Sequence, residues 1–163
     1  SLGCGIVMQM IARDAHHARH FMIGLLHDVG KLVLDIKFPE AYQDVLETAK
    51  RESRPLHAVE LEKLGITHGE VGQEIVLNWQ LPNEFSKIIA YHHTPSESTQ
   101  NQHASSLVYL ADIAVRTMEI GNSGNPADPV IVDPYARRFG VPIKEVLERK
   151  DEIRQQVSAL MGT

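Results

Sequence analysis

The sequence predicts an all-α protein, folded as a single domain over residues 1–163. Apolar residues recur at helical spacing in one segment after another, and Ile6, Val7, Met10 and Ile11 show the pattern near the start. No segment has the convincing alternation of apolar and polar residues that is typical of a half-buried strand. Hydrophobic residues make up 43% of the 163 residues, which is enough to bury a core.

Proline and glycine mark the helix boundaries in the first part of the chain. Pro39 and Pro55 each suit the first turn of a helix. Gly65 suits a helix end, and Gly30 suits the end of the second helix. The stretch 31–36 is apolar but short. The expected helices are, in order, residues 2–12, about 16–26, about 39–51 and about 55–65.

In the second part of the chain a capping box gives the clearest helix start. Thr67 and Glu70 have the spacing at which each side chain bonds the backbone N–H of the other, and Pro82 suits the start of the next helix. Residues 96–102 form a polar loop, and 121–129 form the clearest loop in the chain. The expected helices are 67–79, about 82–93 and 104–120, then two or three shorter ones from about 134, the last rich in charge from 144 to 154.

Charge and composition argue against several classes of partner. The chain has 16 Lys and Arg against 21 Asp and Glu, a formal net charge of -5, whereas nucleic-acid backbones and anionic membranes both favour a basic face. No apolar stretch approaches the roughly 20 residues of a membrane-spanning helix, and the first residues lack the basic start of a secretory signal. The single Cys4 fits a buried structural thiol in a reducing compartment. We therefore expect a soluble cytoplasmic protein, with neither a membrane nor a nucleic acid as its main partner.

Nine histidines are the anomaly of the composition, because they are scattered along the chain rather than gathered in a tract. His27 and Asp28 follow an apolar helix and offer an imidazole nitrogen and a carboxylate oxygen to one point. Divalent metals accept both types of ligand. Taken alone, a His-Asp pair at a helix end is more often a cap or a surface pair.

Asp112 lies within a wholly apolar helical stretch, where it shares a stripe with Val108 and Val115. A buried carboxylate is costly unless it has a cation, a strong set of hydrogen-bond donors or a proton. Two interpretations are equally open for Asp112. It is a metal ligand, or it is an internal acid that forms a salt bridge or bonds to Ser or Tyr.

Three further histidines lie at inward helix ends. His68 shares the core stripe of its helix, and His92 follows the inward face of another, with His93 beside it. Each alone is more often a satisfied core or capping histidine, but together with the doublet and the buried aspartate they predict a metal centre built from several helices. We expect no such role for the others: His57 and His103 lie near helix starts, His16 and His17 are expected to be exposed, and His20 has no evident partner.

Several segments together resemble the HD superfamily. The central motif of that superfamily is matched by residues 24–32, GLLHDVGKL. The HDOD branch in particular is similar at residues 64–72, LGITHGEVG, which are followed by WQLP at 79–82. Its later landmarks are matched by YHH at 91–93 and LVYLAD at 107–112.

The resemblance implies a compact HD-type multi-helix bundle and, for the HDOD branch, an N-terminal helical half that this sequence lacks. It also implies a first metal-ligating histidine about thirty residues before the doublet, near Ser1, yet no histidine occurs before His16. We therefore expect the C-terminal, metal-site portion of a longer protein. The HD-GYP branch, which hydrolyses cyclic di-GMP, has Gly-Tyr-Pro after its paired histidines, whereas Thr94 and Pro95 follow His93 here. That substrate is not expected.

Three functions remain open. The HDOD resemblance implies a regulatory module of bacterial signal transduction, with other signalling domains or proteins as partners. The wider HD resemblance implies a metal-dependent phosphohydrolase that acts on a nucleotide or phosphodiester, and such an enzyme would bind a phosphate-containing small molecule. The third is a helical scaffold whose polar core groups are tied up with one another.

The resemblance also implies roles for individual residues. A divalent metal (Mn, Fe, Ni, Zn or Mg) would be held by His27, Asp28 and Asp112, and a second metal or the leaving phosphate would be met by His68, His92 and His93. Lys31 would neutralise phosphate charge in the hydrolase, and it is equally well interpreted as a surface lysine after a helix end.

Overall fold

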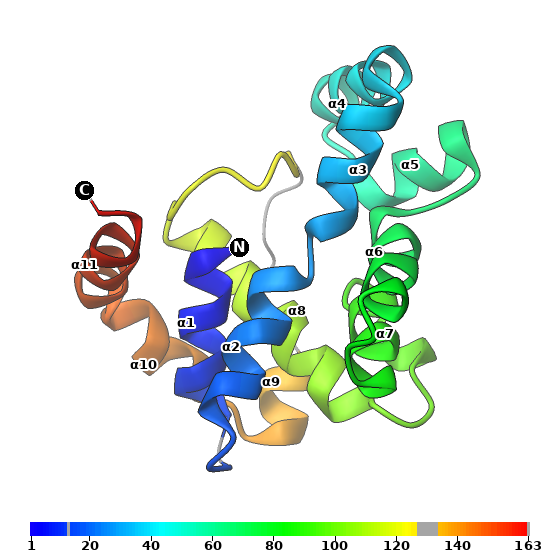
Figure 1. Ribbon diagram of the computed structural model, residues 1–163. Helices are drawn as coiled ribbons and strands as arrows, with labels where there is room; N and C mark the ends of the chain where they lie inside the picture. Colours follow the sequence, from blue (N-terminus) through cyan, green and yellow to red (C-terminus); the bar gives the residue numbers. More distant parts are fainter. Residues whose placement is uncertain (13, 127–133, 163) are drawn as a thin grey trace.

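The computed structural model describes residues 1–12, 14–126 and 134–162, and that part of the chain is helical without any strand (Figure 1). The all-α expectation is therefore confirmed. Among the described residues no helix is both long and apolar enough to cross a bilayer. The elements are α1 (Leu2–Ile11), α2 (His17–Leu26), α3 (Val29–Lys37), α4 (Pro39–Glu52), α5 (Leu56–Leu64), α6 (His68–Asn78), α7 (Asn83–Ala90), the 3-10 helix η1 (Pro95–Glu97), α8 (Gln102–Thr117), α9 (Pro134–Phe139), α10 (Ile143–Glu148) and α11 (Lys150–Met161).

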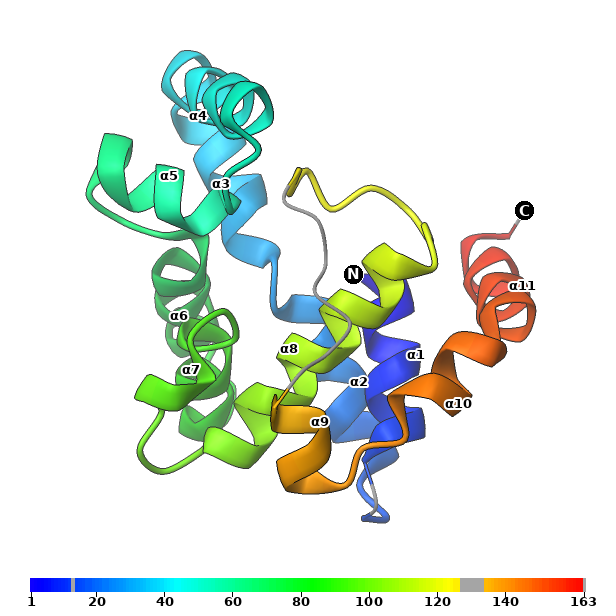
Figure 2. The same cartoon turned by 180° about the vertical axis from the view of Figure 1, so that it is seen from behind.

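The larger hydrophobic core is built around α1 and α8. Helix α1 contacts α2, α8, α10 and α11, and α8 also contacts α7 and α9 (Figures 1 and 2). Helix α1 is apolar on almost every side because it lies between other helices, and Val7 and Met8 are completely buried. Ile23 of α2, Ile88 and Ile89 of α7 and Leu110 of α8 fill the same core.

A second, smaller core lies at the far end of α3. It is formed by Leu34 of α3 with Tyr42, Val45 and Ala49 of α4 and with Leu56 and Val59 of α5. Figure 1 shows α4 and α5 at one end of the molecule, away from α10 and α11 at the other. Helices α3 and α6 join the two cores, because α3 packs on both α4 and α6.

The expected role of Gly30 as the stop of the second helix is wrong. Helix α2 already ends at Leu26, and Gly30 lies inside the first turn of α3, where it is buried. A Cβ on Gly30 would overlap the carbonyl oxygen of His68 and would lie 2.8 Å from the backbone nitrogen of Gly72. The glycine therefore serves the close approach of the α3 and α6 backbones, and it does not end a helix.

Other boundaries differ in ways that affect the site. Helix α7 ends at Ala90, so His92 and His93 lie in the turn that follows it and not on the helix. The apolar stretch 31–36 belongs to the nine-residue helix α3. Residues 121–126 are non-helical as expected, and the remainder of the predicted loop, 127–129, lies outside the described residues.

The capping box at the start of α6 is confirmed. The Glu70 backbone N–H donates to Thr67 Oγ1 over 3.2 Å, and the Thr67 N–H donates to Glu70 Oε2 over 2.8 Å. Two of the N–H groups that a helix start leaves without partners are thus satisfied. The consequence for the site is that His68 is the first residue of α6, with its backbone position fixed.

We predict that Gly30→Ala destabilises the protein by at least about 2 kcal/mol, because the added methyl group must push α3 away from α6. Urea unfolding followed by circular dichroism measures the loss. Gly65→Ala is the control: Gly65 has φ 71°, and none of its described neighbours in space comes within 4 Å of an added Cβ, so only backbone strain of about 1 kcal/mol is expected. Equal losses in the two variants would contradict the close-packing role of Gly30.

Candidate metal centre

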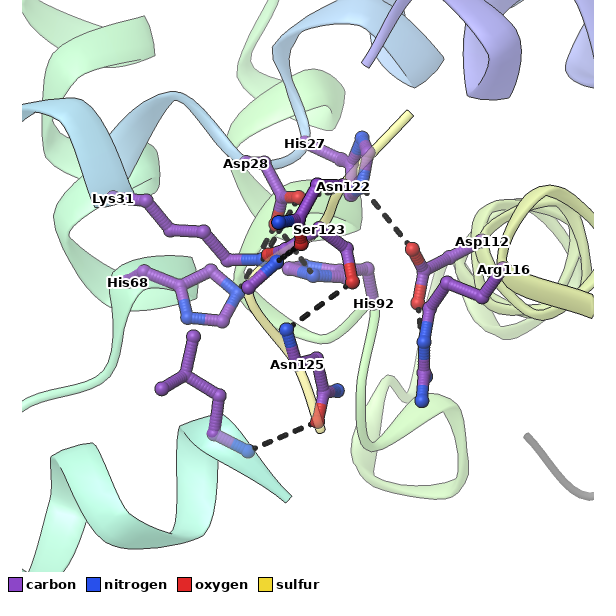
Figure 3. Close-up of polar contacts among 12 residues, drawn as sticks. His27, Asp28, Lys31, His68, His92, Asp112, Arg116, Asn122, Ser123 and Asn125 are labelled. Atoms are coloured by element: carbon purple, nitrogen blue, oxygen red, sulfur yellow. Dashed lines mark hydrogen bonds and ion pairs between the residues drawn. The ribbon is translucent and has the colours of Figure 1, made fainter. Parts of the chain in front are cut away.

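His27 and Asp28 occupy the break between α2 and α3, at the junction of the two cores. The break turns both side chains inward, so His27 is only 2% exposed. His68 at the start of α6 and His92 in the turn after α7 are fully buried beside them. Figure 3 shows these side chains, and Asp112 from α8, directed toward one region from separate elements.

Four of the predicted ligands form one compact group. Each of Asp28, His68, His92 and His93 offers a ligand atom, and these atoms all lie within 4.8 Å of one another. His68 Nε2 and His93 Nε2 are 3.0 Å apart. Two nitrogens at right angles about a shared ion, each about 2.1 Å from it, would be separated by about 3.0 Å. The two rings are thus within hydrogen-bond distance of each other, and the same spacing also suits two ligands of one divalent cation.

The two carboxylate oxygens of Asp28 face different partners. Oδ1 lies 3.3 Å from His68 Nε2 and 3.9 Å from His92 Nε2. Oδ2 lies 3.3 Å from His27 Nε2 and 2.8 Å from Lys31 Nζ. Asp28 is therefore shared between a histidine-rich side of the centre and a second side that contains His27.

Asp112 belongs to that second side, and the structure keeps both of its interpretations open. Its Oδ1 lies 3.9 Å from His27 Nε2, and its Oδ2 lies 3.5 Å from Arg116 Nη1, one turn along α8. The residue is buried, with 8% exposed, as its apolar stretch predicted. Asp112 thus reaches the doublet and also has a cationic partner of its own.

The histidine rings present their Nε2 atoms to the centre because their Nδ1 atoms are held elsewhere. His27 Nδ1 lies 2.7 Å from the Gly24 carbonyl oxygen, and His92 Nδ1 lies 2.6 Å from that of Ile89. A carbonyl oxygen only accepts hydrogen bonds, so Nδ1–H donates and the neutral ring keeps its lone pair on Nε2. Metal-ligating histidines are commonly oriented in this way.

Three buried atoms of the centre have no hydrogen-bond partner within the described residues, namely His27 Nε2, Asp28 Oδ1 and His92 Nε2. A buried polar atom without a partner costs roughly 1–3 kcal/mol, and buried groups in proteins are nearly always satisfied. These atoms are electron-pair donors that converge on one place. The donor set therefore fits a divalent metal ion, which would be held by Asp28, His68, His92 and His93 on one side and by His27, Asp28 and Asp112 on the other.

The electrostatics of the centre also favour a cation. Burial alone would raise the pKa of Asp28, but the charges of His27 and Lys31 outweigh it and hold that pKa well below its usual range. Burial alone would lower the pKa of His27, and the charge of Asp28 outweighs it and raises that pKa well above its usual range. The negative charge of Asp28 thus favours a positive charge beside it, and a metal ion would compete with a proton for His27 Nε2.

The pKa values of His92 and His93 shift in the opposite direction to that of His27. Burial, together with the neighbouring histidines, holds the pKa of each ring well below its usual range. Both rings are therefore neutral at pH 7, the protonation state in which an imidazole binds a metal.

Lys31 is not a freely exposed lysine. Its ammonium group donates to the Ser123 carbonyl oxygen over 3.0 Å while it pairs with Asp28 Oδ2. Lys31 thereby connects α3 to the loop that follows α8. A second contact, from the Leu56 backbone N–H to Asn125 Oδ1 over 3.3 Å, holds that loop against the start of α5.

A cavity of about 450 Å³ opens beside the doublet. Its wall carries Asp28 and Asp112 as well as the two cations Lys31 and Arg116. The buried Cys4 of α1 also lines it, whereas α1 itself contains no histidine.

Sequence reasoning missed two residues of the centre. His57 was expected to need only a solvent or capping role, but its half-buried ring stacks on His93, with centroids 4.5 Å apart and planes 14° from parallel. Glu60 is completely buried and bonds to His68. Its place on the apolar stripe of α5, one turn after Leu56, is a signal that could have revealed it.

The remaining histidines lie outside the centre. His20 is buried, and its Nε2 pairs with Asp14 Oδ1 at 2.8 Å. The ring of His103 packs edge-on against Phe139. Neither contact involves the doublet.

An all-helical fold in which a His-Asp doublet meets histidines and an aspartate from later helices defines an HD-type domain. The chain belongs to the HDOD family, because the HDOD domain pattern matches residues 1–95. The resemblance inferred from the sequence is thereby confirmed.

Solved structures share the fold. A candidate signal transduction protein from Marinobacter aquaeolei VT8 is 22% identical, with a TM-score of 0.79 over 98% of this chain. An HDOD domain protein of unknown function from Geobacter sulfurreducens is 21% identical, with a TM-score of 0.74 over 99% of the chain. A candidate phosphohydrolase from Shewanella amazonensis SB2B is 16% identical, with a TM-score of 0.73 over 95%. The chain spans 35%, 56% and 58% of those proteins, respectively.

We predict that His92→Ala lowers the affinity for Mn, Fe, Ni or Zn at least about tenfold, because it removes a donor atom that a ring anchored at Nδ1 directs inward. Metal analysis after dialysis at defined free metal measures the effect. His20→Ala is the matched control, since it removes an equally buried imidazole outside the centre. Metal retention by the His92 variant, or an equal loss in both, would contradict the assignment.

Proposed function

We propose that the chain is a regulatory module of a signalling protein, and that a divalent cation at the His/Asp centre sets its conformation. The observation that carries the proposal is the convergence of three buried atoms, His27 Nε2, Asp28 Oδ1 and His92 Nε2, which lie at the junction of two cores and find no hydrogen-bond partner in the part of the chain that the structure describes. A cation there would contact groups from the break between α2 and α3, from α6 and α8, and from the turn after α7. Its occupancy would therefore favour one arrangement of these elements over others.

The smaller core is the part of the molecule best placed to respond to metal binding at the centre. Helix α3 carries Gly30 and Lys31 immediately after the doublet, and it also contributes Leu34 to the smaller core. Helix α5 touches the centre through His57 and Glu60. A change at the centre would thus alter the positions of α3, α4 and α5. Other signalling domains or proteins would recognise these helices in their altered positions.

The fold of the Marinobacter protein supports this direction, because that protein is described as a candidate for signal transduction. For the present chain the signalling role and its partners are part of the proposal. The net charge of -5 remains more compatible with protein partners than with a nucleic acid.

We predict that saturating metal slows amide hydrogen exchange in α3, α4 and α5, because openings that break the centre must also release the ion. At a hundredfold excess over Kd this linkage adds about 2.7 kcal/mol to each such opening. Mass spectrometry of exchanged peptides measures it, with α11 as the internal reference because it packs on α1 at the opposite end of the molecule from α4 and α5 (Figure 1). Asp28→Asn should abolish the difference. Metal binding without any change in α3 to α5 would contradict the regulatory coupling.

A second function, a metal-dependent phosphohydrolase, is favoured by the cavity beside the centre. Its volume of about 450 Å³ leaves room for a phosphate-containing molecule. When bound, a divalent metal lowers the pKa of a coordinated water and so supplies a nucleophile near neutral pH. Lys31 and Arg116 would attract and orient the anionic phosphate at the cavity wall. The fold shared with a candidate phosphohydrolase is compatible with this alternative.

If the hydrolase function holds, Lys31→Met should lower kcat/KM for bis(p-nitrophenyl) phosphate about 10- to 100-fold, because phosphate charge then loses a cation at the cavity wall. Release of p-nitrophenolate in the presence of Mn or Ni measures turnover. Lys37→Met removes an exposed lysine from the same helix and should have no effect. No turnover by the unmodified metal-loaded protein would exclude phosphodiester hydrolysis of this probe and leave the regulatory function.

A further inference from the structure

We propose that Glu60 is the positioning residue of the centre: its buried carboxylate holds the His68 ring with Nε2 toward the cation site and ties that ligand to the packing of α4 and α5. The inference depends on the proposed function for the presence of a cation. The geometry that orients His68 is independent of it.

Glu60 has no exposed surface, and the structure gives it three hydrogen bonds. Its Oε2 lies 2.6 Å from His68 Nδ1 and accepts from the His68 backbone N–H over 2.9 Å. Its Oε1 accepts from the Tyr42 hydroxyl group over 3.0 Å. An ionised carboxylate without such partners would cost several kcal/mol in the interior, so this position requires the specific donors that surround it.

The carboxylate determines which nitrogen of His68 faces the centre. An ionised carboxylate only accepts hydrogen bonds, so Nδ1 must carry the proton that it shares with Glu60. In the neutral ring the lone pair is then on Nε2, which lies 3.3 Å from Asp28 Oδ1 and 3.0 Å from His93 Nε2. A charged partner also raises the basicity of the ring and so strengthens it as a metal ligand.

His68 differs from the other ligands in how it is anchored. His27 and His92 bond to the carbonyl group of the residue three positions before them. The partner of His68 is instead charged and comes from another helix, α5. Its orientation therefore depends on where α5 lies, whereas the orientation of the other two rings is local.

Tyr42, Glu60 and His68 form a continuous link from the smaller core to the centre. Tyr42 is a buried member of that core on α4, Glu60 lies on α5, and His68 begins α6. A displacement of α4 or α5 would weaken the hold on His68 and lower the metal affinity. By reciprocity, metal binding would stabilise the present position of both helices.

The test is Glu60→Gln in the full chain, with Zn²⁺ and Mn²⁺ as the probes and a competing chelator to measure affinity. The amide keeps the size of the side chain and removes its charge, so affinity should fall about 10- to 100-fold. Glu74→Gln removes an exposed glutamate from α6 and should leave affinity unchanged. Tyr42→Phe should give a smaller loss, because it removes only the bond to Oε1.

Nitrogen-15 NMR of the His68 ring in the metal-free protein provides a readout that simple loss of packing does not mimic. The unmodified protein should show protonated Nδ1 and unprotonated Nε2 when the ring is neutral, and Glu60→Gln should mix the two tautomers. Unchanged affinity in Glu60→Gln, or a neutral ring protonated at Nε2 in the unmodified protein, overturns the inference. If the unmodified protein binds neither metal, the proposed cation function fails, and the tautomer measurement still decides the role of Glu60.

Discussion

The carboxylate of Asp28 is the group on which the arrangement of the centre depends, because its two oxygens face two different sets of partners. Oδ1 faces His68 and His92, and Oδ2 faces His27 and Lys31. The side chain lies at a break between two helices, and its position follows from the packing of α3 on α6. A negative charge in so buried a place requires cations around it. The structure supplies an ammonium group and imidazole rings, and it leaves donor atoms free for a metal ion.

The local features of the fold were predictable because they depend on neighbours in sequence. The capping box of Thr67 and Glu70 fixes the start of α6, and it was evident from four consecutive residues. The burial of Asp112 was predictable for the same reason, since an acid on an apolar helical stripe must face the core. The convergence of the doublet with His68 and His92 was predictable in the same way. Each of these groups lies on the inward side of its helix or at its end, and one domain offers them a single interior in which to meet.

Features that depend on the approach of distant backbones were not predictable. Gly30 was interpreted as a helix end because glycine is common there, but the structure uses its missing side chain where α3 crosses His68 and Gly72. The apolar stripe of α5 signals that Glu60 is buried, but only the tertiary fold shows that this side of α5, which also carries His57, meets His93 and His68. The ligand roles themselves stay predictions, because sequence and geometry define the donors without identifying the ion.

The contact between Gly30 and α6 has a consequence for how the centre tolerates sequence change. Where two helices touch through their main chains, backbone atoms set the distance between the residues they carry. Backbone atoms, unlike side chains, stay the same when the sequence changes. Asp28 and His68 stand at the starts of the two helices concerned. Substitutions in the hydrophobic cores would alter stability while leaving the spacing of this pair nearly constant. The cores are therefore free to diverge among relatives that keep Gly30 and Gly72.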